Sequence, residues 1–179
     1  MWRKGGIDDG YRAVGMQRML DGLRSSGFKG LAIVTGNHWG DTLVDIANNP
    51  LKNDGNVVYS GHTYPYWCGS HLVLKEEPYM CQGRQRPPFF ESNFQPLIGK
   101  RPVIIGEFGT QRNIDGENRQ VIQWAEDHKI GWLAWQWAAG KIENYTLLQP
   151  DGDTPTAQGK PVRDFLLKSQ GWSKPNNGK

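Results

Sequence analysis

The chain has 179 residues, of which 37% are hydrophobic, and 21 Lys and Arg against 18 Asp and Glu leave a net charge of +3. This size suits one soluble domain with a hydrophobic core, and the small, scattered positive excess argues against nucleic acid and anionic membranes as partners. No run of eighteen apolar residues occurs, and the N-terminal MWRKGGIDDG lacks the apolar core of a signal peptide, so neither a membrane span nor a targeting segment is expected.

The first predicted element is an amphipathic helix from Gly10 to Ser25. Its apolar residues recur at steps of three and four positions: Ala13, Met16, Leu20 and Leu23. Asp8 and Asp9 are available to cap the start of this helix, and Gly27 is available to end it.

Short apolar runs alternate with helical patterns along the rest of the chain. The predicted strands lie at 31–35, 56–62, 103–107 and 132–137, with helices at 42–48, 90–98, 121–125 and 162–166. The first of these strands, LAIVT, reads as fully buried. The alternation indicates parallel strands joined by right-handed crossovers, and therefore an α/β fold. We expect one domain over 1–172, long loops after the second and fourth strands, and a disordered tail at 173–179.

Two cysteines, Cys68 and Cys81, lie in a Gly- and Pro-rich region. They fit a disulfide that pins this loop in an oxidising compartment, and they fit two free buried thiols equally well. Two thiols without patterned histidines fall short of the four ligands of zinc, so no metal site is expected. The sequence has neither a Gly-x-Ser-x-Gly turn nor a phosphate-binding loop, so we expect no esterase, no kinase and no cofactor.

The aromatic residues are typical of a carbohydrate-binding surface. Eight Trp, six Tyr and six Phe make up 11% of the chain, and many lie beside Gly, Asn and His. Trp39 lies in GNHWGD, Trp67 in GHTYPYWCG, and Trp135 and Trp137 in GWLAWQW. A sugar presents C–H faces that stack on aromatic rings and hydroxyls that need hydrogen-bond partners. Each Trp taken singly also fits a place in the hydrophobic core.

A single carboxylate ends the third predicted strand. RPVIIGEFGT, residues 101–110, places Glu107 between two glycines directly after three apolar residues. Burying an unpaired charge is costly, so this glutamate is expected to be paired, protonated or kept for use. The motifs GNHW, GHTYPYW, GEFG and WQWAAG all follow the carboxyl ends of predicted strands. In a parallel sheet or (β/α) barrel, the functional site assembles at that end.

The order of these motifs resembles a known family. GHTYPYW, PVIIGEFG and GWLAWQW resemble the last three strands of glycoside hydrolase family 5, the cellulases and mannanases with (β/α)8 barrels. GLAIVTGNHWGDTL is similar to the fifth strand of that family, and WRKGGIDDGYRAVGMQRMLDGLRSSG to the loop and helix before it. The resemblance covers nearly the whole chain. It implies an α/β fold that is half of a (β/α)8 TIM barrel, with about four parallel strands.

The resemblance also implies roles for individual residues. Glu107 is expected to be the nucleophile that attacks the anomeric carbon, with His62 and Tyr64 touching the substrate and orienting that carboxylate. A glutamate held ionised by a Tyr hydroxyl and a His can act as a nucleophile at neutral pH. Trp135 matches the sugar platform of the eighth strand. The other expected substrate-binding residues are Trp39, Trp67, Trp137 and His38, and His38 fits a loop cap equally well.

The general acid of the family has no counterpart in the sequence. A retaining glycosidase needs two carboxyl groups about 5 to 5.5 Å apart, one that attacks and one that protonates the leaving oxygen. In the family this acid belongs to an Asn-Glu-Pro motif on the fourth strand, which the sequence lacks. The candidate replacements, each of which also suits a solvated surface position, are Asp41, Glu76, Glu77 and Glu91. Asp115, Glu117 and Asp127 are expected at a helix start or on the surface.

A complete barrel takes about 250 residues, so the chain is expected to be the C-terminal half, without strands one to four. Such a half leaves two open sheet edges, and we therefore expect self-association, most simply a homodimer closed edge to edge. The resemblance implies secretion and a β-glucan substrate, cut by a retaining endo-β-1,4-glucanase of the cellulase type. A β-mannanase is an alternative because GWLAWQWAAG also resembles mannanases. A catalytically silent half-barrel that binds glucan is another.

Overall fold

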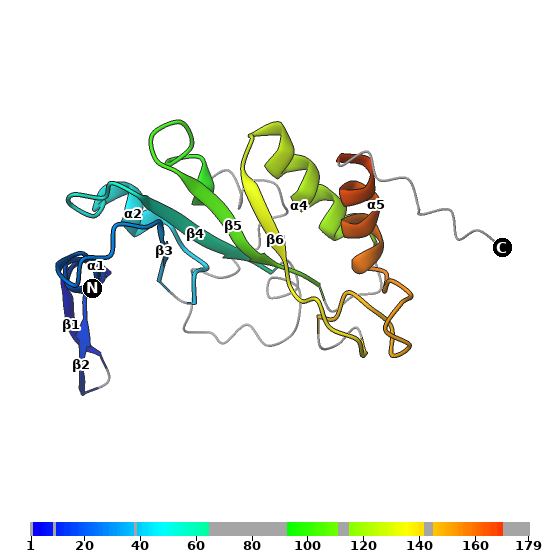
Figure 1. Cartoon of the computed structure of the whole chain (residues 1–179), viewed down its shortest axis with the longest axis horizontal. Helices are drawn as coiled ribbons and strands as arrows, with labels where there is room; N and C mark the ends of the chain where they lie inside the picture. The colour runs from blue at the N-terminus through cyan, green and yellow to red at the C-terminus, as the bar shows by residue number, and fades with distance from the viewer. Residues whose placement is uncertain are drawn as a thin grey trace, which may run out of the picture. The chain divides into compact units, whose positions relative to one another are not determined.

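The structure is a computed structural model that describes residues 2–8, 10–37, 39–64, 93–110, 115–141 and 145–169. The strands are Gly5–Asp8 (β1), Tyr11–Val14 (β2), Ala32–Thr35 (β3), Val57–Thr63 (β4), Val103–Phe108 (β5) and Gly131–Ala134 (β6). The helices are Met16–Ser25 (α1), Val44–Asn48 (α2), Asp115–Asp127 (α4) and Gly159–Ser169 (α5). A parallel sheet with the order β3-β4-β5-β6 and its helices confirm the predicted α/β class (Figure 1).

The described residues form two compact units. The first contains residues 2–63 and 93–106, and the second contains Tyr64 and the described residues from 107 to 169. Strand β5 contributes to both units, because its last two residues, Glu107 and Phe108, belong to the second. The single domain expected over 1–172 stays a prediction, and the tail expected at 173–179 lies outside the described residues.

The N-terminal segment forms a hairpin where a helix was predicted. Strand β1 pairs antiparallel with β2, and α1 begins only at Met16. Gly10 has φ of 80°, which glycine adopts at no steric cost, and an Asp-Gly dipeptide is typical of two-residue hairpin loops. The prediction that the helix starts at Gly10 is therefore wrong. The expected aspartate cap is wrong as well, because Gly15 precedes the helix and no side chain caps it in the described part of the chain.

Strand β3 is buried on one face only. Ala32 and Val34 are buried, whereas Leu31 and Ile33 are 60% and 57% exposed. The prediction of a fully buried strand is therefore wrong. Strand β3 lies at the edge of the described sheet, and alternate side chains of a strand point to opposite faces, so only one of its faces meets the core.

The core of the first unit lies between β4 and its neighbouring segments. Val57 and Tyr59 of β4 are buried with Ile46 of α2 and with Phe94. Of the helix predicted at 90–98, residues 93–98 are described, and they form a helical turn in which the Ile98 N–H donates to the Phe94 carbonyl (3.3 Å).

Tyr59 anchors a partly buried polar cluster in this unit. Its hydroxyl donates to Asp54 Oδ2 (2.8 Å) and accepts the Leu51 N–H (3.3 Å), and Arg101 pairs with the same Asp54. Burial, together with the hydrogen bond to Asp54, raises the pKa of Tyr59 to about 12. The cluster therefore favours the neutral phenol in the folded protein.

Alkaline pH is expected to weaken the fold through Tyr59. Because its folded-state pKa lies above the ordinary tyrosine value of 10.0, the stabilisation is complete below pH 10 and is lost as the pH rises towards 12. A Tyr59→Phe variant should lose less stability over this interval than the native chain, since the other tyrosines titrate in both proteins. Urea unfolding midpoints at about pH 9 and about pH 11 measure the difference. Equal losses in the two proteins would contradict the assignment.

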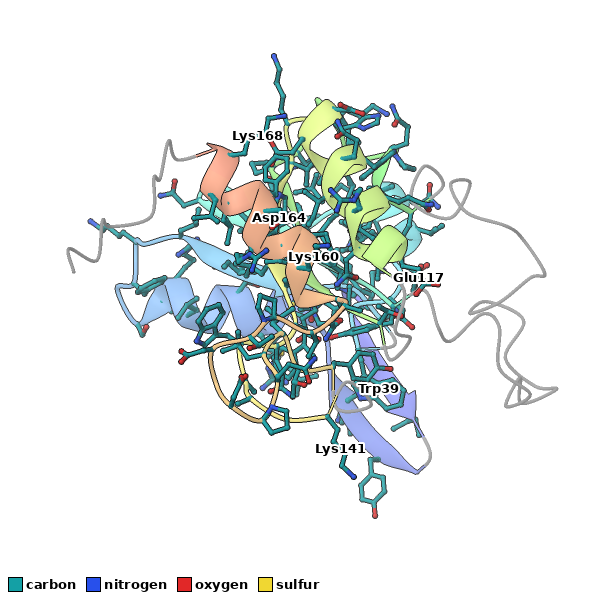
Figure 2. All side chains as sticks on the ribbon, turned by 90° about the vertical axis from the view of Figure 1, so that its right-hand side faces the viewer. Trp39, Glu117, Lys141, Lys160, Asp164 and Lys168 are labelled. Atoms are coloured by element: carbon teal, nitrogen blue, oxygen red, sulfur yellow. The ribbon has the colours of Figure 1, made fainter. Side chains whose placement is uncertain are left out.

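In the second unit, helices α4 and α5 pack side by side and α4 also contacts β6 (Figure 1). The apolar face of α4 that the sequence predicts is confirmed, because Val121, Ile122 and Ala125 are buried. Trp132 of β6 packs edge to face against Phe108, with ring centroids 5.7 Å apart. The polar face of α5 carries Lys160, Asp164 and Lys168 at successive turns (Figure 2). Among the described residues, no helix is long and apolar enough to cross a membrane.

Candidate active site

Two of the three predicted catalytic residues meet in the second unit. Glu107 lies near the carboxyl end of β5, and Tyr64 is the first residue after β4. The Tyr64 hydroxyl donates a hydrogen bond to Glu107 Oε2 (2.7 Å). The Tyr64 ring packs edge to face on Tyr145, with centroids 5.1 Å apart. A hydroxyl bond to a carboxylate stabilises its negative charge and fixes its orientation.

Close packing explains why the GEFG motif has a glycine at each end. A Cβ atom on Gly106 would lie 1.9 Å from Ser60 Oγ of β4. A Cβ atom on Gly109 would lie 2.6 Å from the Trp135 carbonyl oxygen and 3.2 Å from Tyr145 Cδ1. Side chains at these two positions would collide with their neighbours, so the chain can bring Glu107 close to its surroundings only with glycine there.

The predicted platform Trp135 follows β6 rather than lying on it. Its backbone N–H donates to the Phe108 carbonyl (2.8 Å), and its peptide bond to Gln136 is cis. The strand predicted at 132–137 ends earlier, at Ala134, and Gln136 pairs with Tyr145 and Leu147 through backbone hydrogen bonds. Trp135 is 42% exposed and Trp137 is 78% exposed. Both indoles thus present area on which a ligand could stack.

Other predicted site residues belong to the first unit. His62 lies on β4, and its backbone N–H donates to the Gly40 carbonyl (2.9 Å). A Cβ atom on Gly40 would lie 2.8 Å from His62 Cγ, so glycine lets this loop approach the imidazole. Trp39, next to Gly40, is 82% exposed (Figure 2). The structure brings this loop and His62 together. His38 and Trp67 lie outside the described residues.

The candidate acids are placed only in part. Asp41 follows the Trp39 loop, and its carbonyl accepts from Asn93 Nδ2 (2.8 Å). Of the acids expected at a helix start or on the surface, Glu117 on the first turns of α4 accepts from Thr110 Oγ1, and Asp127 near the end of α4 accepts from Gln123 Nε2 (2.8 Å). Glu76, Glu77 and Glu91 lie outside the described residues. No group of three or more His, Cys, Asp and Glu that could hold a metal ion occurs among the residues described.

Sequence reasoning missed two residues of this site, Tyr145 and Gln158. Both lie in the stretch 141–160, which was predicted only as a loop. Tyr145 belongs to a segment whose backbone pairs with the segment after Trp135, through Gln136 N–H to Tyr145 O (2.6 Å) and Leu147 N–H to Gln136 O (3.0 Å). Gln158 is fully buried. A polar loop sequence carries no periodic signal that would have marked either residue.

Comparisons with known proteins find one matching family and several relatives. The sequence model of the family described as Cellulase (glycosyl hydrolase family 5) matches residues 12–141. The chain is 26% identical over 151 residues to a "Beta-mannanase/endoglucanase A" of Caldicellulosiruptor saccharolyticus, covering 78% of this chain and 10% of that protein. It is 28% identical over 153 residues to a "Mannan endo-1,4-beta-mannosidase" of Salipaludibacillus agaradhaerens, covering 79% and 42%. The chain thus spans less than half the length of these relatives.

Solved structures share the fold. A β-glucanase from Saccharophagus degradans gives a TM-score of 0.66 at 17% identity, over 86% of this chain and 46% of that one. An endocellulase from the archaeon Pyrococcus horikoshii gives 0.65 at 17% identity, over 90% and 51%. The four-stranded sheet with its helices therefore corresponds to about half of a cellulase TIM barrel, which confirms the predicted fold.

Proposed function

The chain belongs to glycosyl hydrolase family 5, and from this we propose that it takes part in hydrolysing β-1,4-glucan with retention of configuration, with Glu107 as the nucleophile. The observation that carries the proposal is the hydrogen bond from Tyr64 to Glu107 at the carboxyl end of β5. Active sites of (β/α) barrels assemble at this end of the strands. Tyr64 and Glu107, which belong to two of the motifs that resemble the family, are thus hydrogen-bonded to each other.

The proposed reaction has two displacements. Glu107 Oε1 attacks the anomeric carbon while the bond to the leaving oxygen breaks, and that oxygen takes a proton from a general acid. Water then attacks the anomeric carbon and gives a proton to the conjugate base of the same acid, and Glu107 leaves as a carboxylate. The Tyr64 hydroxyl holds Oε2 throughout and stabilises the charge that returns to Glu107.

The exposed aromatic residues are the proposed sugar platforms. Trp135 and Trp137 in the second unit and Trp39 in the first each expose an indole, and stacking on a glucose ring would cover it. His62 is proposed to contact substrate as well, together with His38 and Trp67, which lie outside the described residues. Because such polymers are too large to enter a cell, we propose that the protein acts outside it.

The choice of test substrate depends on whether its leaving group must be protonated by a general acid. A dinitrophenolate leaves without protonation, whereas a sugar alcohol leaves only with an acid present. We expect the chain to cleave 2,4-dinitrophenyl β-cellobioside even if no residue acts as a general acid. Release of reducing ends from carboxymethyl cellulose is expected only if a residue does act as one. Failure on the aryl glycoside, with the protein folded, would refute the proposed hydrolase.

A β-mannanase is a second candidate, favoured by the two mannan-cleaving relatives named above. The dinitrophenyl β-mannobioside and soluble β-mannan, assayed in parallel, discriminate the two sugars. A larger kcat/KM on the mannobioside would replace the glucanase with the mannanase. If neither aryl glycoside is cleaved but soluble glucan still retards the protein on a native gel, the chain is a silent glucan-binding half-barrel.

Mutation of Tyr64 to Phe is expected to slow cleavage of the aryl glycoside by roughly 10- to 100-fold in kcat, because it removes one hydrogen bond to the nucleophile. The ring and its packing on Tyr145 remain, so the melting temperature should change little. Steady-state kinetics with the aryl cellobioside measure the effect. An unchanged kcat would show that this hydrogen bond has no part in the chemistry.

We propose that a second copy of the chain pairs with the edges of the sheet. Strands β3 and β6 are the outer strands, and each carries an exposed apolar residue, Ile33 at 57% and Leu133 at 58%. Unpaired edges with apolar side chains favour pairing with another chain. Light scattering is expected to give a mass twice the 20.2 kDa of one chain or a larger multiple. A stable monomer would contradict the proposal.

A further inference from the structure

Gln158, the residue before α5, places its side chain between two segments of the second unit. Its Oε1 accepts the Thr110 backbone N–H (2.8 Å), and its Nε2 donates to the Thr146 carbonyl (3.1 Å). The side chain is fully buried. Asn118 of α4 donates to the backbone carbonyl of Gln158 (3.1 Å) and to its Oε1 (3.3 Å), which holds the carboxamide in place.

Each end of this carboxamide reaches a part of the candidate site. Thr110 lies three residues after Glu107 on the same extended stretch. Thr146 follows Tyr145, whose ring supports the ring of Tyr64. Tyr145 and Leu147 also bind the backbone of Gln136, the residue after Trp135.

The packing around Gly109 shows how closely these parts meet. A Cβ atom there would lie 3.2 Å from both Gln158 Oε1 and Tyr145 Cδ1. The residues directly after β5, the strand that carries Glu107, are therefore close to the carboxamide and to the ring that supports Tyr64. A shift in one of them would be transmitted to the others, because closely packed groups have little room to move independently.

We infer that Gln158 is a positioning residue that sets the alignment of Tyr64 with Glu107. It fixes the stretch after the nucleophile through Thr110 and the segment behind Tyr64 through Thr146. This role deepens the proposed glycosidase function and rests on it for its catalytic consequence. The geometric consequence, the placement of the Tyr64 hydroxyl on Glu107, holds for a catalyst and for a silent binding protein alike.

The role requires a carboxamide and not merely a side chain of this shape. The Thr110 N–H needs an acceptor and the Thr146 carbonyl needs a donor, and a neutral amide supplies both from one planar group. A leucine supplies neither. A carboxylate supplies only acceptors and would face the Thr146 carbonyl with negative charge, whereas a protonated carboxyl group supplies one acceptor and one donor again.

The first experiment compares Gln158→Leu with Ile122→Ala, a buried change on α4 that also costs stability but leaves both hydrogen bonds of the carboxamide in place. Proteins labelled with ¹³C at tyrosine Cζ report the hydroxyl environment of Tyr64, whose resonance is assigned by its loss in Tyr64→Phe. We expect this resonance to shift or split in Gln158→Leu and to stay in place in Ile122→Ala. On the aryl cellobioside, kcat should fall roughly 100-fold in Gln158→Leu alone, the loss expected for a misplaced catalytic group.

The second experiment uses Gln158→Glu as a conditional rescue. Burial favours the neutral form of a carboxyl group, so lowering the pH restores the donor. The activity of this variant relative to the native chain should rise by roughly 10-fold or more between about pH 8 and about pH 5, whereas the same ratio for Ile122→Ala stays flat.

The outcomes separate the two proposals. If the native chain cleaves no glycoside, the proposed function fails, and the tyrosine spectra alone decide the positioning role. The positioning role is overturned if the Tyr64 resonance is the same in Gln158→Leu as in the native chain, or if Ile122→Ala displaces it equally. A pH-independent activity ratio for Gln158→Glu overturns it as well, because the donor would then have no effect.

Discussion

Glu107→Gln is expected to abolish glycoside cleavage while the fold stays intact. An amide is isosteric with the carboxylate and can still accept from the Tyr64 hydroxyl, but it has no charge with which to attack an anomeric carbon. The rate on 2,4-dinitrophenyl β-cellobioside should fall by roughly 10⁴-fold or more, the scale seen when a central catalytic group is removed. Circular dichroism and the melting temperature establish that the variant is folded.

The control for this variant is Glu126→Gln, the same chemical change in the same unit. Glu126 accepts from Trp132 Nε1 (2.9 Å) at an exposed position, and glutamine can also accept this bond. We expect native activity in the control. Comparable losses in both variants would point to a general loss of structure, and full activity in Glu107→Gln would remove Glu107 from the mechanism.

Gly109→Ala is expected to damage both stability and activity. The new methyl group would lie 2.6 Å from the Trp135 carbonyl oxygen, a backbone atom that cannot rotate away, so the residues directly after β5 must separate from the segment after β6. Such overpacking costs about 1–3 kcal/mol of unfolding free energy. The backbone hydrogen bond from Trp135 to Phe108 lies beside the clash, and its loss would displace Glu107 by enough to reduce kcat about 100-fold.

Gly116→Ala serves as the matched control. Gly116 lies on α4 with open space where a Cβ atom would be placed. Alanine has the higher helix propensity, so this variant should gain roughly 0.5–1 kcal/mol and keep native activity. Urea unfolding and aryl cellobioside kinetics on both variants test the pair. A Gly109→Ala protein as stable as the native chain would show that the close approach at Trp135 relaxes at little cost.

The sheet and the Tyr64–Glu107 pair were within reach of the sequence because each rests on a local signal. The apolar runs of β4 and β5 are bounded by turn residues, and the following motifs mark the carboxyl ends of the strands. The carboxylate between two glycines was expected to be paired, protonated or kept for use, and it accepts a hydrogen bond from Tyr64. The structure explains the glycines by the approach of Ser60 and of Trp135.

The N-terminal hairpin was missed because the helical period of α1 extends by chance into β2. Ala13 continues the spacing of Met16 and Leu20, and the Asp-Gly turn signal was read as a helix cap instead. The exposure of Ile33 could not be predicted from its apolar neighbours Ala32 and Val34. The sequence does not show that this strand lies at an edge of the sheet.

Gln158 could not be predicted from the sequence for a different reason. Its partners are the backbone atoms of Thr110 and Thr146, and a backbone group carries no side-chain identity from which its position could be inferred. Contacts over 48 and 12 positions in the chain become visible only once the fold brings them together. The buried polar network behind the site is thus a product of tertiary structure alone.

The most direct measurement is covalent capture of the nucleophile with 2,4-dinitrophenyl 2-deoxy-2-fluoro-β-cellobioside. The fluorine slows both displacements and the dinitrophenolate leaves without an acid, so the glycosyl intermediate accumulates. We expect a mass gain of one fluorocellobiosyl group per chain, located on the peptide that contains Glu107 and absent from Glu107→Gln. A label on a different carboxylate, or an unlabelled chain that still cleaves the dinitrophenyl cellobioside, would contradict the role of Glu107 as the nucleophile.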